Sequence, residues 1–174
     1  MLDRNLIDAL DGINGDPYDG FAWRVSWTAR DPLASSSGGG RWAPEGRFDV
    51  LYTALEANGA LSEVYYHLSR APIFSSSDMT INKIRVMLSN VLRLDSKLLD
   101  EMKIGDPLSS KKLRPTQLVG ETAYMLDFNG LRVPSARSVG EKLVIFRDVL
   151  GHECEMEVLS TEPVNWPAWK KSQE

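Results

Sequence analysis

The stretch from Gly38 to Glu63 carries the side chains of this chain that are best suited to binding and chemistry. A run of three glycines ends at Gly40 and is followed directly by Arg41, with Tyr52 eleven residues after Arg41 and Glu63 eleven residues after Tyr52. Glycine allows a backbone to approach a ligand closely, and a guanidinium suits phosphate or carboxylate groups. The pattern indicates a cation, an aromatic ring and a carboxylate that converge on one site.

The glycine run also has a simpler interpretation. Ser35-Ser36-Ser37 precedes it, and clusters of glycine and serine commonly form surface loops. Composition alone leaves a flexible loop and an anion-binding turn about equally supported. The arginine and tryptophan that follow the glycines favour the anion-binding turn slightly.

Arg24 and its neighbours show the alternation of a half-buried strand. Over Phe21–Trp27 the two tryptophans fall on one side and Arg24 falls on the other, which is the period of a strand. Charged side chains are rarely buried, so alternation alone predicts that Arg24 lies in solvent.

A helix that carries Glu63 is expected to begin at Thr53. Thr53-Ala54-Leu55-Glu56 matches the capping box, in which the threonine and glutamate side chains satisfy each other's backbone donors. The helix would have an apolar stripe of Leu61, Val64, Tyr65 and Leu68. Glu63 and His67 then fall on the opposite face, where periodicity alone predicts solvated side chains.

Two details make Glu63 the better chemical candidate of the helix. Gly59 and Ala60 lie one turn before it, so the surface beside its carboxylate is shallow and could seat a ligand. Glu56 would already serve the cap, whereas His67 is interpreted as a residue of the helix surface.

The remaining helices and loops are short. Helices are predicted near the N-terminus through Leu2, Leu6 and Leu10, over Ser96–Met102, and from Pro115 to Asn129-Gly130, which would end that helix in a left-handed C-cap. Gly105-Asp106-Pro107 is expected in a loop, and the tail with Trp166 and Trp169 is expected to be a packed loop.

Strand patterns occupy much of the second half of the sequence. Strands are predicted over Met79–Leu94 with an interruption near Ser89-Asn90, over 131–135, over Leu143–Phe146 and over Cys154–Leu159. Neither an internal repeat nor a domain boundary is evident, so residues 1–174 are expected to form a single domain.

Composition excludes several classes of protein. The chain has 174 residues, 43% hydrophobic and 25% charged, as expected for one globular domain. A net charge of −4 and a small basic cluster at Lys111-Lys112 and Arg114 predict no direct nucleic acid binding. Cys154 is the single cysteine, which fits a reducing cytoplasm. No secretion signal or membrane-spanning run is visible, and no metal motif occurs, so neither membrane association nor a catalytic metal is expected.

Five short segments together resemble the RES domain, a family named for an arginine, a glutamate and a serine. In order, they are Trp23-Arg24-Val25, Gly39-Gly40-Arg41-Trp42, Leu51-Tyr52-Thr53, Leu61-Ser62-Glu63-Val64 and Leu131-Arg132-Val133-Pro134-Ser135-Ala136. The resemblance spans roughly residues 21–150, and residues 151–174 would form a C-terminal strand and tail. No single segment is decisive, but five in register are fairly specific.

The resemblance implies a fold and an activity. It implies an α/β (α+β) fold, a single compact domain with a mixed, largely antiparallel β core flanked by helices, like that of ADP-ribosyltransferases. RES proteins serve as bacterial toxins that degrade NAD and are neutralised by an Xre-type antitoxin protein. NAD would be the substrate, and no other cofactor is implied. By position, the family's polar site residues are Arg24, Arg41, Tyr52, Glu63 and Ser135.

The chemistry assigns a role to each of these five residues. Cleavage of the nicotinamide–ribose bond passes through an oxocarbenium-like sugar, which the carboxylate of Glu63 would stabilise. Arg24 and Arg41 would bind the diphosphate, Tyr52 would stack on nicotinamide or ribose, and the hydroxyl of Ser135 would orient Glu63 or the ribose. We therefore expect Glu63, Arg24 and Ser135 to be catalytic and Arg41 and Tyr52 to bind substrate.

Two departures from the family pattern affect the loop that contacts substrate. Ala43 stands where asparagine is common, and Ala34-Ser35-Ser36-Ser37 stands where a basic or small-basic pattern is usual. All five site residues are present, so activity is predicted.

Two other functions remain compatible with the sequence. An ADP-ribosyltransferase would use the same site with a protein or nucleotide acceptor, and a non-enzymatic protein of an operon pair would keep the cleft as a ligand pocket or interface. The acceptor of the ribosyl group, whether water, phosphate or a macromolecule, is left open by the sequence.

Overall fold

The structure, a computed structural model, describes residues 3–70, 78–104, 111–135 and 137–174. Its helices are α1 (Arg4–Asp11), α2 (Ala57–Leu68), α3 (Ser96–Glu101), α4 (Arg114–Met125) and α5 (Trp166–Ser172), with a 3-10 turn, η1, at Arg147–Val149. Its strands are β1 (Asp16–Trp27), β2 (Val50–Ala54), β3 (Met79–Arg93), β4 (Gly130–Pro134), β5 (Glu141–Phe146) and β6 (Glu155–Pro163).

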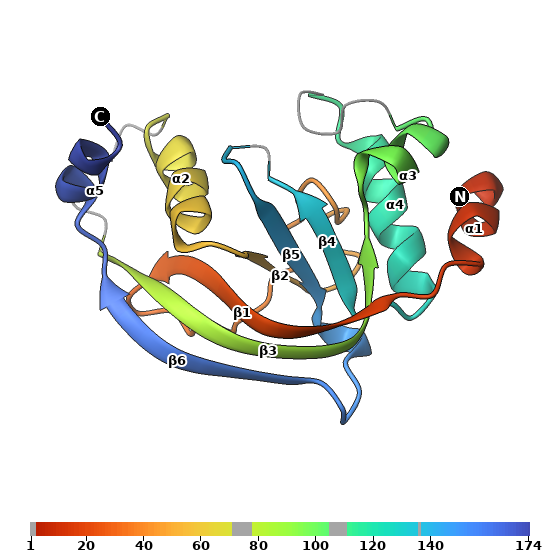
Figure 1. Cartoon of the computed structure of the whole chain (residues 1–174), viewed down its shortest axis with the longest axis horizontal. Coiled ribbons are helices and arrows are strands. Elements are labelled where there is room, and N and C mark those ends of the chain that lie inside the picture. The colour runs from red at the N-terminus through yellow and green to blue at the C-terminus, as the bar shows by residue number, and fades with distance from the viewer. Residues whose placement is uncertain (1–2, 71–77, 105–110, 136) are drawn as a thin grey trace.

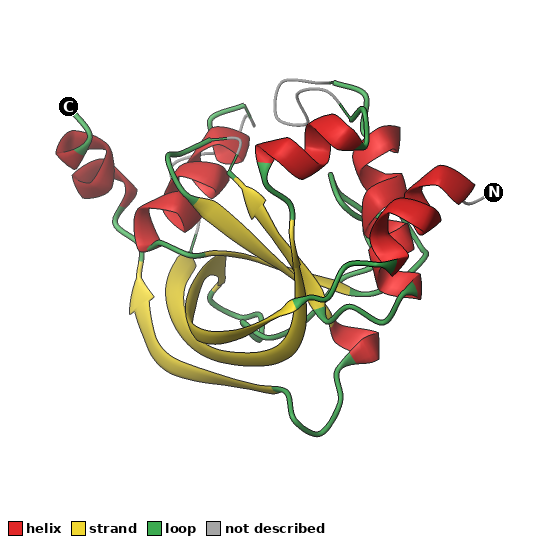
Figure 2. Ribbon diagram, turned by 45° about the vertical axis from the view of Figure 1, so that its right-hand side comes forward, coloured by secondary structure: helices red, strands yellow, loops and turns green. Residues whose placement is uncertain are grey.

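Five of the strands close into a barrel. The order β1-β2-β5-β4-β3 is completed by a long antiparallel pairing of β3 with β1, and β6 adds to the outside of β3 (Figure 2). The β3–β4 pair is parallel, whereas the other pairs are antiparallel. This topology confirms the predicted mixed, largely antiparallel core with flanking helices.

The helices pack on the barrel in two groups. In Figure 1, α1, α3 and α4 gather at one end of the molecule, and α2 and α5 lie at the other. Helices α1, α3 and α4 cover the largest apolar core, which includes Trp42 and Phe146, while α2 and α5 enclose a smaller one around Val25 and Trp166. In the described part of the chain, no helix is long and apolar enough to cross a membrane.

Strand β3 is continuous where an interruption was expected. Its fifteen residues run through Ser89 and Asn90, because Asn129 satisfies the polar groups there. The Asn129 Oδ1 atom accepts hydrogen bonds from the backbone N–H of Ser89 at 3.0 Å and of Asn90 at 2.8 Å. A buried amide therefore holds the strand together at the point where its sequence becomes polar.

The predicted capping box is wrong. Thr53 belongs to β2, and its hydroxyl donates to the carbonyl oxygen of Leu143 on β5 at 2.8 Å. Helix α2 begins at Ala57, with Glu56 at the N-cap and no side-chain capping bond. Pairing with β5 buries Thr53 within the sheet, and this tertiary pairing outweighs a local capping preference.

The end of helix α4 and the C-terminal tail also differ from expectation. Helix α4 ends at Met125, before Asn129-Gly130, and Gly130 begins β4 instead. A Cβ at Gly130 would lie 2.2 Å from the carbonyl oxygen of Val144, so the close approach of β5 requires glycine.

The tail forms helix α5, whose N-cap Asn165 accepts a hydrogen bond from the backbone N–H of Ala168. The expected loop at Gly105-Asp106-Pro107 lies outside the described residues.

The other predicted elements are confirmed with shifted ends. They are the N-terminal helix α1, the short helix α3, and strands β1, β4, β5 and β6.

Candidate active site

The glycine turn packs closely against its neighbours. Gly39 has a φ of +77°, a conformation that favours glycine. A Cβ at Gly40 would lie 2.5 Å from the phenol oxygen of Tyr52, so the turn rests directly on the tyrosine. The glycines therefore let backbone approach a side chain of the site itself.

Helix α4 fixes the same turn from the other side. The hydroxyl of Thr116 donates to the carbonyl oxygen of Arg41 at 2.6 Å, and the side-chain amide of Gln117 donates to that of Gly40 at 3.0 Å. At Gly120 a Cβ would lie 1.7 Å from the carbonyl oxygen of Trp42. The carbonyl groups of the turn are thus held against α4.

Tyr52 on β2 links the turn to the barrel. Its phenol oxygen accepts a hydrogen bond from the backbone N–H of Trp42 at 3.2 Å. The pKa of the phenol is raised to about 12 because the effect of burial outweighs the opposing effects of the backbone donors and of Arg41. Tyr52 is therefore neutral at physiological pH and offers a fixed aromatic ring.

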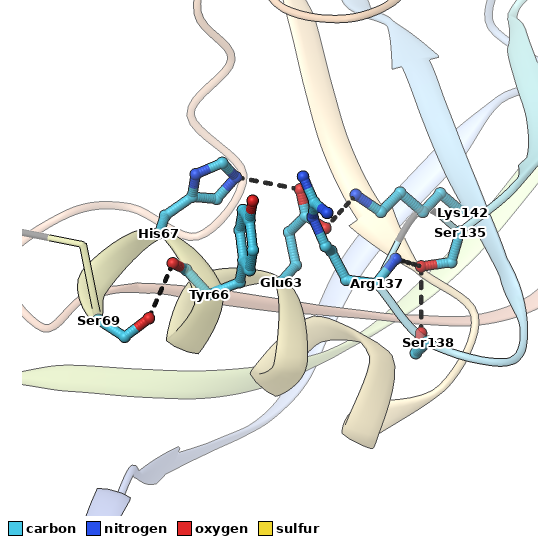
Figure 3. Close-up of polar contacts among 8 residues, drawn as sticks. All are labelled: Glu63, Tyr66, His67, Ser69, Ser135, Arg137, Ser138 and Lys142. Carbon is cyan, nitrogen blue, oxygen red and sulfur yellow. Dashed lines mark hydrogen bonds and ion pairs between the residues drawn. The ribbon is translucent and has the colours of Figure 1, made fainter. Parts of the chain in front are cut away.

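Glu63 on α2 is held between two basic side chains. Its Oε2 atom lies 2.8 Å from Nζ of Lys142, and its Oε1 atom lies 3.2 Å from Nε2 of His67 (Figure 3). Oε2 is buried and forms an ion pair with the ammonium, without the geometry of a hydrogen bond. Burial raises the pKa of Glu63, but Lys142 and then His67 lower it by more, so its pKa lies below the ordinary value.

The expectation of a solvated Glu63 is therefore wrong. Its side chain is 27% exposed, and Lys142 of β5 and His67 of α2 lie against its carboxylate. The surface interpretation of His67 holds for its 66% exposed ring, which nevertheless contacts the carboxylate.

Two adjoining cavities meet at Glu63. The larger, of about 470 Å³, is lined by Arg41, Tyr52, Glu63, His67, Arg137 and Lys142, among others. The smaller, of about 180 Å³, is lined by Arg24 and shares Tyr52, Glu63 and Lys142 with the larger. The fold thus brings Arg41, Tyr52 and Glu63 into the larger cavity. Arg24 lines only the smaller cavity.

A larger cavity lies elsewhere. It measures about 980 Å³ and runs between α1, α3 and α4, where its lining includes Leu6, Met102 and Leu118. It contains none of the predicted site residues, so the chemistry points to the smaller pair of cavities around Glu63.

The model of the RES domain matches residues 21–167 of the sequence. The chain belongs to the RES domain family. Comparison with curated proteins gave no match.

Solved structures resemble this RES domain to different degrees. A chain of the M. tuberculosis MbcT–MbcA toxin–antitoxin complex matches it with a TM-score of 0.84 at 22% identity, over 98% of each chain. That likeness shows a shared fold. An anti-CRISPR protein matches it at 15% identity, over 85% of this chain and 100% of the other. Its TM-score of 0.39 is too low to indicate a shared fold.

Arg24 of this RES domain is tied to the loop that precedes the glycine turn. Its Nη1 atom donates to the carbonyl oxygens of Pro32 at 2.8 Å and Ala34 at 2.7 Å. Burial lowers its pKa to about 10, which still leaves the guanidinium charged at neutral pH. Arg24 shares the inward face of β1 with the buried Ala22 and Ser26, so the prediction of a solvated arginine is wrong.

Ser135 lies at the end of β4 and is 8% exposed. Its hydroxyl oxygen accepts bonds from the backbone N–H of Arg137 at 3.3 Å and from the hydroxyl of Ser138 at 3.1 Å (Figure 3). These bonds stay within the β4–β5 loop, and none of the described hydrogen bonds joins Ser135 to Glu63. The serine is near the cavity through Pro134, which lines it.

Lys142 and Arg137 line the larger cavity but were not predicted from the sequence. Lys142 is the second residue of strand β5, and its side chain is 16% exposed. A buried carboxylate requires a compensating cation, but periodicity predicted a solvated Glu63, so the sequence did not indicate that a lysine would meet it. Arg137 follows the serine of the last RES segment by two residues and gives no pattern of its own.

The described residues include no group of three or more His, Cys, Asp or Glu side chains that could hold a metal ion. The groups around Glu63 are instead three cations and a histidine, which suit an anionic organic ligand.

Proposed function

We propose that this RES domain degrades NAD by cleaving the bond between nicotinamide and ribose, as the toxin of a toxin–antitoxin pair. The observation that carries the proposal is the concentration of Arg41, Arg137 and Lys142 around one carboxylate in a cavity of about 470 Å³. The chain as a whole has a net charge of −4, so this cavity is a local exception suited to a diphosphate.

Glu63 is the catalytic carboxylate in this proposal. As the C1′–N bond of the ribosyl group breaks, its electron pair goes to the nicotinamide nitrogen and positive charge develops on the sugar. The ionised carboxylate of Glu63 stabilises that charge. An oxygen of water or phosphate then forms the new bond to C1′, and the proton lost from a water passes to solvent. Nicotinamide is a good leaving group without protonation, so a second acid is not required.

The other predicted residues have supporting roles. Arg41 binds the diphosphate from the fixed glycine turn, and Tyr52 supplies a ring against which nicotinamide or ribose packs. Arg24 borders the smaller cavity beneath Glu63, where its charge favours an anion on the acceptor side. Its two bonds to the loop at Pro32 and Ala34 also keep the approach to the glycine turn in place.

The decisive experiment is to incubate the purified chain with NAD and follow nicotinamide release with and without phosphate. Glu63→Gln removes the charge with little change in shape and is expected to reduce the rate by at least about 100-fold. Glu155→Gln on the exposed edge of β6 is the matched control and should have wild-type activity. Release of no nicotinamide by the wild type at high enzyme concentration would contradict the proposal.

The same assay separates the alternative functions. NAD labelled in its adenylate half leaves the label on protein or a nucleotide if the chain is an ADP-ribosyltransferase. A chain that binds NAD without consuming it is a non-enzymatic binding protein. A rate that requires phosphate identifies a phosphorylase, and a rate independent of phosphate identifies a glycohydrolase.

An Xre-type antitoxin is the proposed partner. A chain of similar fold occurs in the MbcT–MbcA toxin–antitoxin complex. Expression of the chain should arrest bacterial growth, expression of Glu63→Gln should not, and co-expression with the protein encoded in the adjacent reading frame should restore growth. Unchanged growth on expression of active chain would argue against a toxin.

A further inference from the structure

We propose that Arg137 is the second diphosphate-binding guanidinium of the site, and that Tyr66 and Ser135 hold it in position. This inference rests on the proposed function and assigns the anchoring of its substrate. It also reassigns the binding of the diphosphate, which the sequence analysis gave to Arg24 and Arg41, to Arg137 and Arg41.

The two cavities separate these arginines. Arg41 and Arg137 line the larger cavity, which Glu63 also lines, whereas Arg24 lines the smaller one. The Nη1 atom of Arg24 already donates to two backbone carbonyls. A diphosphate in the larger cavity therefore meets Arg137 more readily than Arg24.

Tyr66 on α2 provides a platform for the guanidinium. Cζ of Arg137 lies 3.6 Å from the centroid of the Tyr66 ring, and Cζ of Arg70 lies 4.1 Å from the same centroid. A guanidinium held against an aromatic ring is restricted in orientation and keeps its N–H edge available, so less entropy is lost when it binds an anion. Among the described residues, none accepts a hydrogen bond from the Arg137 guanidinium.

Ser135 holds the backbone that carries Arg137. Its hydroxyl oxygen accepts the N–H of Arg137, and its own N–H donates to the carbonyl oxygen of Gly140 at 2.9 Å. The first of these bonds is drawn in Figure 3, and the second ties Ser135 to the residue that precedes β5. Ser135 is thus a positioning residue that acts through Arg137, and not a group that touches the reacting atoms.

Arg137→Gln and Arg70→Gln form a matched pair. Both remove a cation from the Tyr66 ring, but Arg70 does not line the larger cavity. For Arg137→Gln we expect KM for NAD to rise by roughly 10- to 100-fold, as for a lost charge-assisted contact, with kcat changed less than about twofold. Arg70→Gln should have wild-type kinetics. Equal effects of the two variants, or an unchanged KM in Arg137→Gln, would overturn the inference.

Two ligands locate the contact on the diphosphate. Binding of ADP, measured by calorimetry, should weaken about as much as KM rises in Arg137→Gln. Nicotinamide riboside lacks phosphate, so any cleavage of it should be equally fast in wild type and variant. Selective loss with the riboside would instead place Arg137 at the reacting sugar and overturn the inference.

A double-mutant cycle tests the role of Ser135. Ser135→Ala should raise KM in the wild type and have little further effect in Arg137→Gln. Additive effects, or a fall in kcat with KM unchanged, would show that the serine acts independently of Arg137. Thermal unfolding of each variant verifies that it is folded.

These results distinguish failure of the inference from failure of the proposed function. If the wild type neither cleaves NAD nor binds ADP, the proposed function fails and the inference fails with it. If the wild type cleaves NAD and Arg137→Gln matches it in KM, the inference alone fails.

Discussion

The ammonium of Lys142 lies 2.8 Å from Oε2 of Glu63, and this ion pair joins the start of strand β5 to the middle of helix α2. Both side chains are largely covered, with 16% of the lysine and 27% of the glutamate exposed. The pair also forms part of the wall between the two cavities. A single ion pair therefore fixes the position and the charge of the proposed catalytic group.

Replacing Lys142 should move the acid limb of the pH–rate profile. Burial raises the pKa of Glu63 and Lys142 is the first group that lowers it, so Lys142→Met should raise the pKa of the carboxyl. The expected result is that kcat/KM for NAD begins to fall at a higher pH as the solution is acidified. Lys142→Arg keeps the charge and should restore much of the wild-type profile. An acid limb at the same pH in all three proteins would contradict the argument.

The same pair should make stability depend on pH. The pKa of Glu63 is lowered in the folded state, so the pair stabilises the fold above the unfolded pKa of glutamate, about 4.3. That stabilisation is lost as the pH falls through the lower folded value. The difference in unfolding free energy between wild type and Lys142→Met, from urea titrations, should therefore be larger at pH 7 than at pH 3. A difference that grows in acid has the wrong sign.

Loss of the Tyr52 hydroxyl should lower stability and leave the alkaline limb of activity unchanged. Tyr52→Phe leaves the backbone N–H of Trp42 without its acceptor, which costs about 1–3 kcal/mol when the donor is buried. Because the pKa of the phenol is about 12, the wild type should have no alkaline limb from this group below that pH. Urea unfolding and a rate profile up to pH 10 measure both effects, and an alkaline limb that disappears in Tyr52→Phe would refute the assignment.

The sequence predicted the fold best where its pattern and the tertiary structure agree. Alternation over Phe21–Trp27 predicted strand β1, but not which face is inward, because both faces of β1 are partly covered by the barrel and by α2. Thr53 was predicted to cap a helix, but its pairing with β5 places it in a strand. Local patterns do not contain the partner strand, so these two features required the structure.

The site was predictable in part for the same reason. Arg41, Tyr52 and Glu63 were expected together and line one cavity, because each follows from a short segment with a family resemblance. Lys142 and Arg137 belong to a loop and strand start far along the sequence, and only the closed barrel brings them to α2. Their roles depend on long-range pairing that no local motif encodes.

The glycine turn should tolerate alanine at one position and not at its neighbour. In Gly40→Ala the new Cβ would lie 2.5 Å from Oη and 2.9 Å from Cζ of Tyr52, whereas in Gly38→Ala the nearest atom is the flexible Ser36 hydroxyl at 3.1 Å. Overpacking of this kind costs about 1–3 kcal/mol and would displace the ring from the cavity. We expect Gly40→Ala to lose both stability and NAD cleavage and Gly38→Ala to keep them. Similar behaviour of the two variants would show that the turn is flexible.

Removing the side chain of Arg24 should loosen the segment before the glycine turn. Its guanidinium is bonded to the carbonyl oxygens of Pro32 and Ala34, and Arg24→Met loses both bonds while keeping much of the side-chain volume. Amide hydrogen exchange, read by mass spectrometry, should become faster over residues 31–37 and stay unchanged in β3. The control is Arg30→Met, an exposed arginine near the same loop. Protection of residues 31–37 equal to that of the wild type would mean that Arg24 does not hold the loop, and any loss of activity would then reflect its charge beside the smaller cavity.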